Sequence, residues 1–299
     1  MRALVTGATG FIGGHLATKL ALEGADIRCL VRSEQGAEKL RAKGYEVHVG
    51  DVTDAASLHG VGEGVDIAYY LVHSMGRGGK QFRERDAAGA TAFAQMAKRE
   101  GIARVVYLGG LGDKPKSQHL ISRNEDAQIL RNEGPPLTYF RAAMVVGAES
   151  ESYKTLRYLV ERLPAMIAPA WLKYFTQPVA IDDVVDYLYE ASQLPDSSGI
   201  DIQIGGPDVI SYGDMLDEMA RVLGKRRRPR LPVPFITPRL SSLWIGLVTP
   251  VDAPLARLLI ESLSTSTIVT DPQPAAMFSV VPMSFEESIR RAMTEDAAT

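Results

Sequence analysis

Short apolar runs alternate with amphipathic segments through the first half of the chain. Six runs of strand length each carry three or more apolar residues, at 2–7, 26–31, 45–50, 66–72, 104–109 and 137–142. Segments of helical length lie between them, for example at 13–24 and 82–101. This alternation predicts right-handed βαβ units and a mostly parallel sheet covered by helices on both faces.

The pattern changes after residue 150, where prolines and longer irregular segments appear. Residues 181–194 predict another helix and 202–206 another strand, so we expect segment 177–206 to rejoin the sheet. The predicted fold class is a Rossmann-type doubly wound α/β domain over residues 1–150. A smaller substrate-binding lobe would follow, built from 151–176 and 207–299.

Two capping boxes predict helix starts inside that lobe. "SYGD" (211–214) precedes "MLDEMARVLG", and "SFEE" (284–287) precedes "SIRRAM". In each, a serine would accept from a main-chain amide three residues later. The segment "LSSLWIGLV" (240–248) is far short of the roughly 20 residues that cross a bilayer. It predicts a buried helix, with an interfacial contact as the alternative.

Composition narrows the range of functions. The chain has 299 residues, 45% hydrophobic and 23% charged, with a net charge of −3. These values predict an ordinary globular protein and disfavour a general nucleic-acid or membrane-surface binder. The basic run "KRRRPR" (225–230) has no interleaved aromatic residues, so we interpret it as a solvated loop.

Compartment and metal content follow from the same composition. Cys29 is the single cysteine, which excludes an intrachain disulfide and fits a reducing cytoplasm. The N-terminus passes straight into a strand-like run, and we expect no signal peptide, a cytoplasmic location and no metal ion.

A glycine-rich stretch, "TGATGFIGGHL" (6–16), joins the first predicted strand to the first helix. Gly7 would permit the tight turn, Gly10 would let backbone approach a pyrophosphate, and Gly13 would allow close helix–strand packing. The helix N-terminus would then offer its amides to phosphates. A purely structural glycine turn is the alternative. The predicted contacts here are Thr6, Gly7, Thr9, Gly10, Phe11, Ile12 and Gly13.

The next two strand ends bear on the choice of cofactor. The second strand ends in Arg32, where an NAD site usually has an acidic residue, so the hypothesis is NADP(H) in preference to NAD(H). An exposed arginine at a strand end is the alternative. Asp51, in "GDVTD" (50–54), would accept from the adenine amino group beside the Val52 amide. A helix N-cap is the alternative role, and both can hold at once.

Taken together, these motifs resemble the extended and atypical short-chain dehydrogenase/reductases, and most of all the NmrA-like, NAD(P)H-binding branch described as nucleoside-diphosphate-sugar epimerase-like. "TGATGFIG", "GDVTD", "YLVHSMG" (70–76) and "YFRAAMVVG" (139–147) carry the likeness, which extends over nearly the whole chain. The resemblance implies that Leu71, Val72 and His73 line the ribose and nicotinamide. It implies that Ala142, Ala143 and Met144 flank the nicotinamide. Two roles are open for His73: it transfers a proton, or it touches the cofactor as a polar loop residue without transferring one.

The usual catalytic residues of that superfamily are absent. A Tyr-x-x-x-Lys pair is expected on the helix after the fifth strand, with a serine at the strand end. Here His119 and Arg123 occupy the Tyr and Lys spacing, and Gly109 and Gly110 stand in place of the serine pair. His119 is the candidate proton donor, with water as the alternative. Arg123 is a candidate cofactor contact that cannot relay protons.

Two functions remain open at this level. The first is an NADPH-dependent reductase of a carbonyl, quinone or enone, with an apolar small-molecule substrate under the lobe. Its apolar segment 153–175 would contribute to a pocket, although most such residues must be core. The second is a non-catalytic NADP(H)-binding sensor or scaffold. Epimerase chemistry is disfavoured because it needs the missing tyrosine. The chain could be a monomer or a homodimer.

Overall fold

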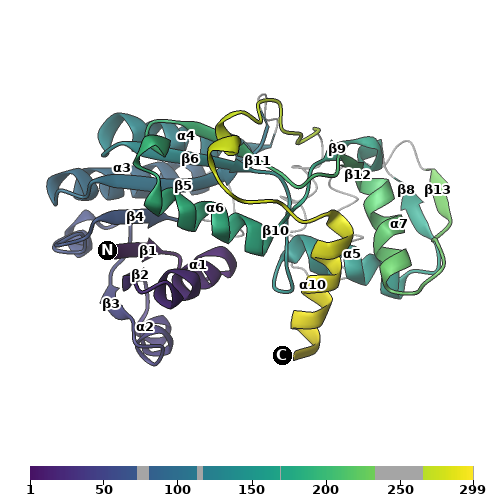
Figure 1. Cartoon of the computed structure of the whole chain (residues 1–299), viewed down its shortest axis with the longest axis horizontal. Helices are drawn as coiled ribbons and strands as arrows, with labels where there is room; N and C mark the ends of the chain where they lie inside the picture. Colours follow the sequence, from purple (N-terminus) through teal and green to yellow (C-terminus); the bar gives the residue numbers. More distant parts are fainter. Residues whose placement is uncertain (73–80, 113–116, 169, 233–264, 299) are drawn as a thin grey trace.

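The computed structural model describes residues 1–72, 81–112, 117–168, 170–232 and 265–298. Its centre is a parallel sheet of seven strands in the order β11-β6-β5-β4-β1-β2-β3 (Figure 1). The strands are β1 (Arg2–Thr6), β2 (Asp26–Val31), β3 (Glu46–Val49), β4 (Ile67–Tyr70), β5 (Arg104–Gly110), β6 (Leu137–Ala142) and β11 (Asp201–Ile204). The predicted parallel sheet and the return of the late strand are both confirmed.

Helices cover both faces of this sheet, as predicted. One face packs against α1 (Phe11–Leu22), α2 (Glu34–Arg41) and α6 (Ile181–Gln193). The other face packs against α3 (Gln81–Arg99), α4 (Gln118–Glu133) and the short turn η1 (Ala55–Leu58). The strands are nearly continuous apolar runs because both faces are buried.

A third apolar core lies outside the sheet. It is formed by α5 (Glu151–Arg162), α7 (Tyr212–Val222) and α10 (Phe285–Ala298), seen at the right of Figure 1. The short elements around it are β7 (Val145–Val146), β8 (Met166–Ala168), η2 (Ala170–Lys173), β9 (Phe175–Thr176), β10 (Val179–Ala180), η3 (Pro195–Ser197), β12 (Ile210–Ser211), β13 (Arg230–Pro232) and η4 (Pro274–Met277). Both predicted capping boxes are present at the starts of α7 and α10.

The C-terminal segment joins the two cores. Phe278 packs against Phe140 and Tyr187 in the sheet core, although the sequence assigned this part to the lobe. The following helix α10 inserts Phe285 and Ile289 among the lobe residues. The range 207–299 therefore serves both cores and is not confined to the lobe.

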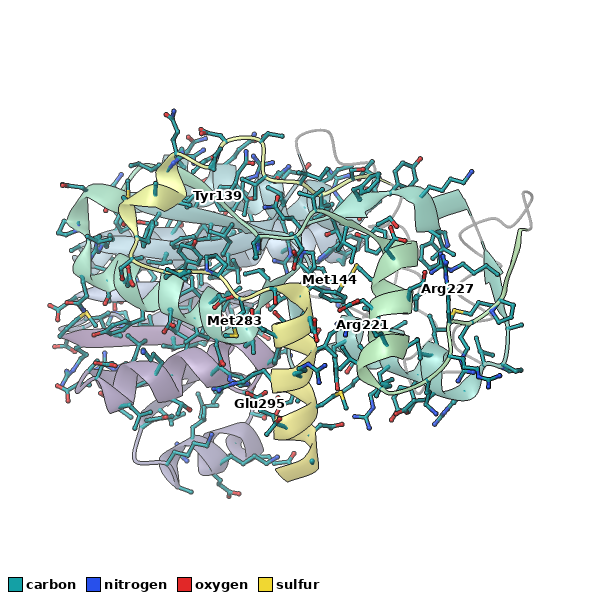
Figure 2. The ribbon with its side chains drawn as sticks, turned by 45° about the vertical axis from the view of Figure 1, so that its right-hand side comes forward. Tyr139, Met144, Arg221, Arg227, Met283 and Glu295 are labelled. Atoms are coloured by element: carbon teal, nitrogen blue, oxygen red, sulfur yellow. The ribbon has the colours of Figure 1, made fainter. Side chains whose placement is uncertain are left out.

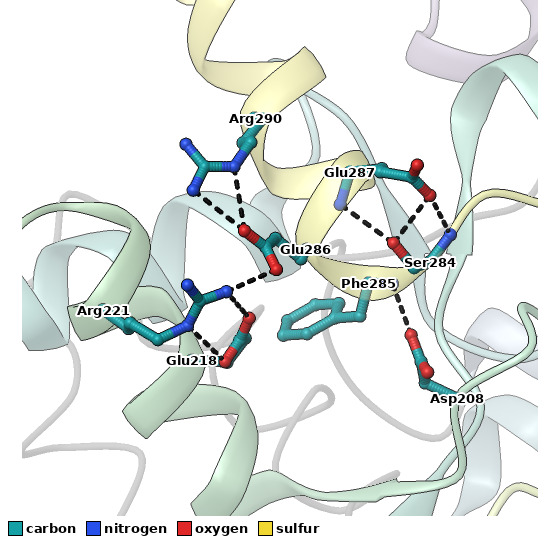
Figure 3. Close-up of polar contacts among 8 residues, drawn as sticks. All are labelled: Asp208, Glu218, Arg221, Ser284, Phe285, Glu286, Glu287 and Arg290. Carbon is teal, nitrogen blue, oxygen red and sulfur yellow. Dashed lines mark hydrogen bonds and ion pairs between the residues drawn. The ribbon is translucent and has the colours of Figure 1, made fainter.

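Ion pairs fix α10 against its neighbours. Glu286 pairs with Arg290 on α10 and with Arg221 on α7, and the Phe285 amide donates to Asp208 (Figure 3). On the opposite side Arg291 pairs with Asp182 of α6. Helix α10 thus stands between α7 and the sheet domain, as Figure 2 also shows.

The basic run 225–230 is largely the exposed loop that the sequence predicted, since Lys225, Arg226 and Arg227 are exposed, but three of its arginines also make contacts within the lobe. Arg228 donates to the Val160 carbonyl at the end of α5, and Arg230 pairs with Asp217 on α7. Arg227 also pairs with Asp217. These cations are used within the lobe because the carbonyl end of a helix and a carboxylate both attract them.

Candidate cofactor-binding site

The turn after β1 has the geometry that its glycines predict. Gly7 adopts φ +71°, a conformation that strongly favours glycine. A Cβ at Gly7 would lie 2.6 Å from the Leu71 carbonyl oxygen, and one at Gly13 would lie 2.6 Å from the Gly7 carbonyl carbon. Only glycine therefore fits at either position without moving main chain.

The first turn of α1 leaves main-chain amides without a side-chain partner. Gly10 is the N-cap and offers no side-chain hydrogen bond, and the first turn contains no acidic residue. Phe11 and Ile12 open the helix behind it. A helix start with unsatisfied N–H groups and a positive dipole end favours a bound anion.

Thr6 has a different role from the cofactor contact that its position in the motif predicts. Its hydroxyl donates to the Tyr69 carbonyl at 3.1 Å and accepts from the Leu71 amide at 2.9 Å, and the side chain is fully buried. It ties the end of β1 to the end of β4. The hydroxyl is therefore committed to joining the two strands.

The ends of β4 and β6 lie at the same edge of the sheet as this turn, because the strands are parallel. Leu71 and Val72 follow β4, and a Cβ on Gly7 would meet both. Ala142 ends β6, and the Met144 carbonyl accepts from Val179 of β10. Met144 also packs against the lobe core at the junction seen in Figure 2. Ala143 lies between them, whereas His73 lies outside the described residues.

The side of the edge where adenosine is expected carries a cation, Arg32, and a carboxylate, Asp51. Burial opposes ionisation of Asp51, but hydrogen bonds from the Thr53 amide and hydroxyl, with the Arg32 charge, lower its pKa. The N-cap of η1 is Asp54, not Asp51. Asp51 instead closes the turn at 51–53, beside Val52.

A groove of about 1110 Å³ opens from the glycine turn between α1, α2, α6 and α10. Ala8, Thr9 and Gly10 line one end, and Lys39 of α2 and Lys43, just after α2, line another part. The start of α2 comes close to the turn, because a Cβ on Gly36 would lie 3.3 Å from Thr9 Cγ2. The groove therefore brings cationic side chains near the expected phosphate position.

His119 and Arg123, the residues expected at the usual Tyr and Lys spacing, lie four positions apart on α4. Arg123 Nη1 donates to the Leu108 carbonyl of β5 at 3.0 Å. Burial, and then the Arg123 charge, lower the pKa of His119 to about 3. A neutral imidazole at pH 7 has no imidazolium proton to give, so this opposes the expectation that His119 acts as the acid.

Side chains from β6 and α4 occupy the space beside Gly109 and Gly110 on β5. A Cβ on Gly109 would lie 2.5 Å from the Tyr139 hydroxyl, and one on Gly110 would overlap Leu120 Cδ2. The Tyr139 hydroxyl donates to Asn124 Oδ1 at 3.0 Å. Sequence reasoning missed this substitution, since nothing in the local pattern says that a tyrosine from β6 reaches over the neighbouring strand.

Comparison with known proteins points to one kind of cofactor. A family model described as NAD(P)H-binding matches residues 7–156. The (4-alkanoyl-5-oxo-2,5-dihydrofuran-3-yl)methyl phosphate reductase of Streptomyces griseus is 28% identical over 231 residues, which cover 75% of each chain. Subunit 9 of the NADH dehydrogenase [ubiquinone] 1 alpha subcomplex of Arabidopsis thaliana is 27% identical over 90% of this chain and 71% of its own length.

A solved structure shares the fold. The triphenylmethane reductase of Citrobacter sp., complexed with NADP(H), superposes with a TM-score of 0.79 at 15% identity. The superposition covers 98% of this chain and 100% of that one. In the part of this chain that the structure describes, no helix is long and apolar enough to span a bilayer. The predicted helix at 240–248 lies outside the described residues.

Proposed function

The chain belongs to the NAD(P)H-binding family, and from that premise we propose that it is an NADPH-dependent oxidoreductase. Its reaction would be reduction of a carbonyl, quinone or enone without the usual tyrosine–lysine pair. The observation that carries the proposal is the first βα turn. There Gly7 and Gly13 leave no space for side chains, and the start of α1 is left uncapped.

A bound reduced nicotinamide would supply the hydride. The residues of this chain would bind the cofactor and position its ring. Amides at Phe11 and Ile12 would hold the phosphates, since the Gly10 amide donates to the Gly7 carbonyl, and Leu71 with Val72 would line the edge beside Gly7. Ala143 and Met144 would flank the ring from the end of β6. Arg123 would neutralise negative charge, while water would deliver the proton, because His119 is held neutral.

The preference for NADP(H) rests on Arg32. Its charge acts on Asp51, so the cation lies on the adenosine side of the strand edge. The Ser33 hydroxyl accepts from the Gly36 amide and still has its own proton to donate. A 2′-phosphate between Arg32 and Ser33 would meet both a cation and a donor, whereas an unmodified ribose would not need either.

Our proposal for the substrate class is supported more by the relatives than by the structure of the lobe. In the lobe, Tyr153, Leu156 and Leu159 are buried in its own core, as the sequence alternative anticipated. The relative from Streptomyces griseus is named as a reductase of a phosphate ester whose dihydrofuran ring carries an alkanoyl group, and the Citrobacter enzyme is a triphenylmethane reductase. A conjugated acceptor is therefore the substrate class that we propose, and its apolar character rests on the composition of the lobe alone.

A non-catalytic role is the second candidate, and one comparison favours it. The relative from Arabidopsis thaliana is a subunit of a larger dehydrogenase complex and matches 90% of this chain. A chain that keeps the glycine turn and lacks a side-chain acid is compatible with such a role. It would bind NADP(H) as a sensor or scaffold.

Two measurements separate these functions. Calorimetry gives the Kd for NADPH and NADH, and absorbance of the reduced nicotinamide follows turnover with a panel of quinones, aldehydes and enones. Tighter NADPH binding with turnover on at least one panel member is the expected result. Binding without turnover on any member would favour the sensor, and no binding of either cofactor would end both proposals.

A further inference from the structure

Helix α4 carries a buried acidic residue, Asp126, for which the described part of the chain provides no hydrogen-bond partner. Asp126 is 1% exposed, and neither of its carboxyl oxygens completes a hydrogen bond in the described part of the chain. The buried hydroxyl of Tyr107 on β5 is unpaired in the same way. An ionised carboxylate buried without donors is costly, so this interior position favours a bound proton.

A second carboxyl approaches from the facing helix. Asp86 on α3 is also buried, and the Ser122 hydroxyl donates to its Oδ2 at 3.2 Å. Ser122 and Asp126 are four residues apart on α4, so their side chains are neighbours on one helix face. The hydrogen bond from Ser122 therefore brings Asp86 close to Asp126. A negative charge on Asp86 disfavours ionisation of Asp126 in this dry layer, which favours a proton on Asp126.

The charged and titratable groups around the pair come from every packed element. Burial, and then the charge of Asp86, raise the pKa of Asp126 to about 7, while Arg123 opposes that rise. The Tyr107 hydroxyl faces the carboxyl and favours its ionised form, but without normal hydrogen-bond geometry. The remaining groups are Glu125 on α4, Tyr70 on β4 and Tyr139 on β6.

The pair lies behind the strand ends that form the candidate cofactor edge. Tyr70 is the last residue of β4 and directly precedes Leu71. Burial is the main cause of its raised pKa, and the negative charges of Asp126, Asp86 and Asp51 raise this pKa further. A Cβ on Gly89 of α3 would lie 3.1 Å from the Tyr70 hydroxyl and 3.0 Å from Val52 Cγ2. The carboxyl pair, Tyr70 and the 51–52 turn are thus close enough to sense one another's charge.

We propose that Asp86 and Asp126 form an interior proton-binding site that takes up a proton from solvent when an anionic dinucleotide binds at the neighbouring strand ends. Negative phosphates draw on the same Arg123 charge that stabilises ionised Asp126, and buried charges are weakly screened by salt. One proton moves from the buffer to the carboxyl pair, and no covalent bond of the cofactor changes. This inference rests on the cofactor binding proposed above.

Calorimetry of cofactor binding tests it without any substrate. Binding is measured near neutral pH in two buffers with different heats of ionisation, so that the difference in enthalpy counts the protons taken up. NADH is titrated beside NADPH because it lacks a 2′-phosphate that could itself titrate. The wild-type chain is expected to take up a fraction of one proton with either cofactor. Asp126→Asn should bind and show no such uptake.

Glu133→Gln, on the same helix at the exposed end, is the matched control and should behave as wild type. Equal uptake in wild type and Asp126→Asn, or heats that do not depend on buffer in wild type, would overturn the proton site while cofactor binding stands. No heat with either cofactor would instead contradict the proposed function, and proton uptake with it. If Asp126→Asn does not fold, Asp86→Asn is measured in its place and should likewise reduce the uptake.

Discussion

The Tyr139 hydroxyl occupies the position that a side chain on Gly109 would need, since a Cβ there would lie 2.5 Å from it. Tyr139 is itself buried and donates to Asn124, so it is not a mobile side chain that could move aside. The absence of the usual serine is therefore built into the packing of β5, β6 and α4. Changing a single residue cannot restore the usual site.

Gly109→Ser tests this packing. The added side chain overlaps the Tyr139 ring, and overpacking of a close-packed core typically costs about 1–3 kcal/mol of unfolding free energy. Denaturant unfolding measures the loss. In a Tyr139→Leu background the same substitution should cost clearly less, because the ring is gone, and equal costs in the two backgrounds would contradict the assigned clash.

Alanine substitution of two neighbouring glycines in the first turn of α1 should have different effects on NADPH binding. Gly13→Ala places a methyl group against the Gly7 main chain and should weaken NADPH binding by about tenfold or more, or about 1.4 kcal/mol. Gly14→Ala is the matched control, because its Cβ would lie 3.4 Å from the Ala8 carbonyl, an ordinary contact. Helix propensity predicts that it gains up to about 1 kcal/mol of stability. Similar losses of affinity in both variants would count against the proposed phosphate site.

Arg32→Glu should reverse the cofactor preference. A carboxylate repels a 2′-phosphate and can accept from a ribose hydroxyl, so the ratio of the NADH and NADPH dissociation constants should shift by about tenfold or more towards NADH. Calorimetry with both cofactors gives the ratio. Arg41→Glu, at the far end of α2, carries the same change of charge and should leave the ratio close to that of wild type.

Loss of His119 should not abolish turnover. Since its lowered pKa keeps the imidazole neutral over the physiological range, His119→Ala should retain kcat/KM within about threefold, and the pH profile should show no inflection from this residue. His119→Gln keeps an N–H donor and separates hydrogen bonding from proton transfer. A loss above tenfold in both variants would restore His119 as a proton donor.

The C-terminal helix should stabilise the lobe through its first residue. Phe285 is 2% exposed within the third core, and truncating a buried phenylalanine typically costs about 3–5 kcal/mol. Denaturant unfolding of Phe285→Ala measures this cost. Val281→Ala, at a position 86% exposed just before the helix, should change stability by no more than about 0.5 kcal/mol. A two-step transition in Phe285→Ala would show that the lobe unfolds separately.

The sequence by itself determined the alternation of strands and helices along the first half of the chain, because the period of apolar residues is a local property of the chain. It also identified the glycine turn, since Gly7 and Gly13 meet main chain only a few residues away or at the next strand of the sheet. The capping serines at 211 and 284 were predictable for the same reason.

Tertiary structure decided what fills the gaps between those elements. No pattern along the chain places Tyr139 over Gly109, links Ser122 of α4 to Asp86 of α3, or commits the Thr6 hydroxyl to β4. These relationships depend on side chains from distant segments meeting in one packed layer. Burial there also sets the ionisation of His119 and Asp126, which residue type alone does not fix, because a pKa follows from surroundings.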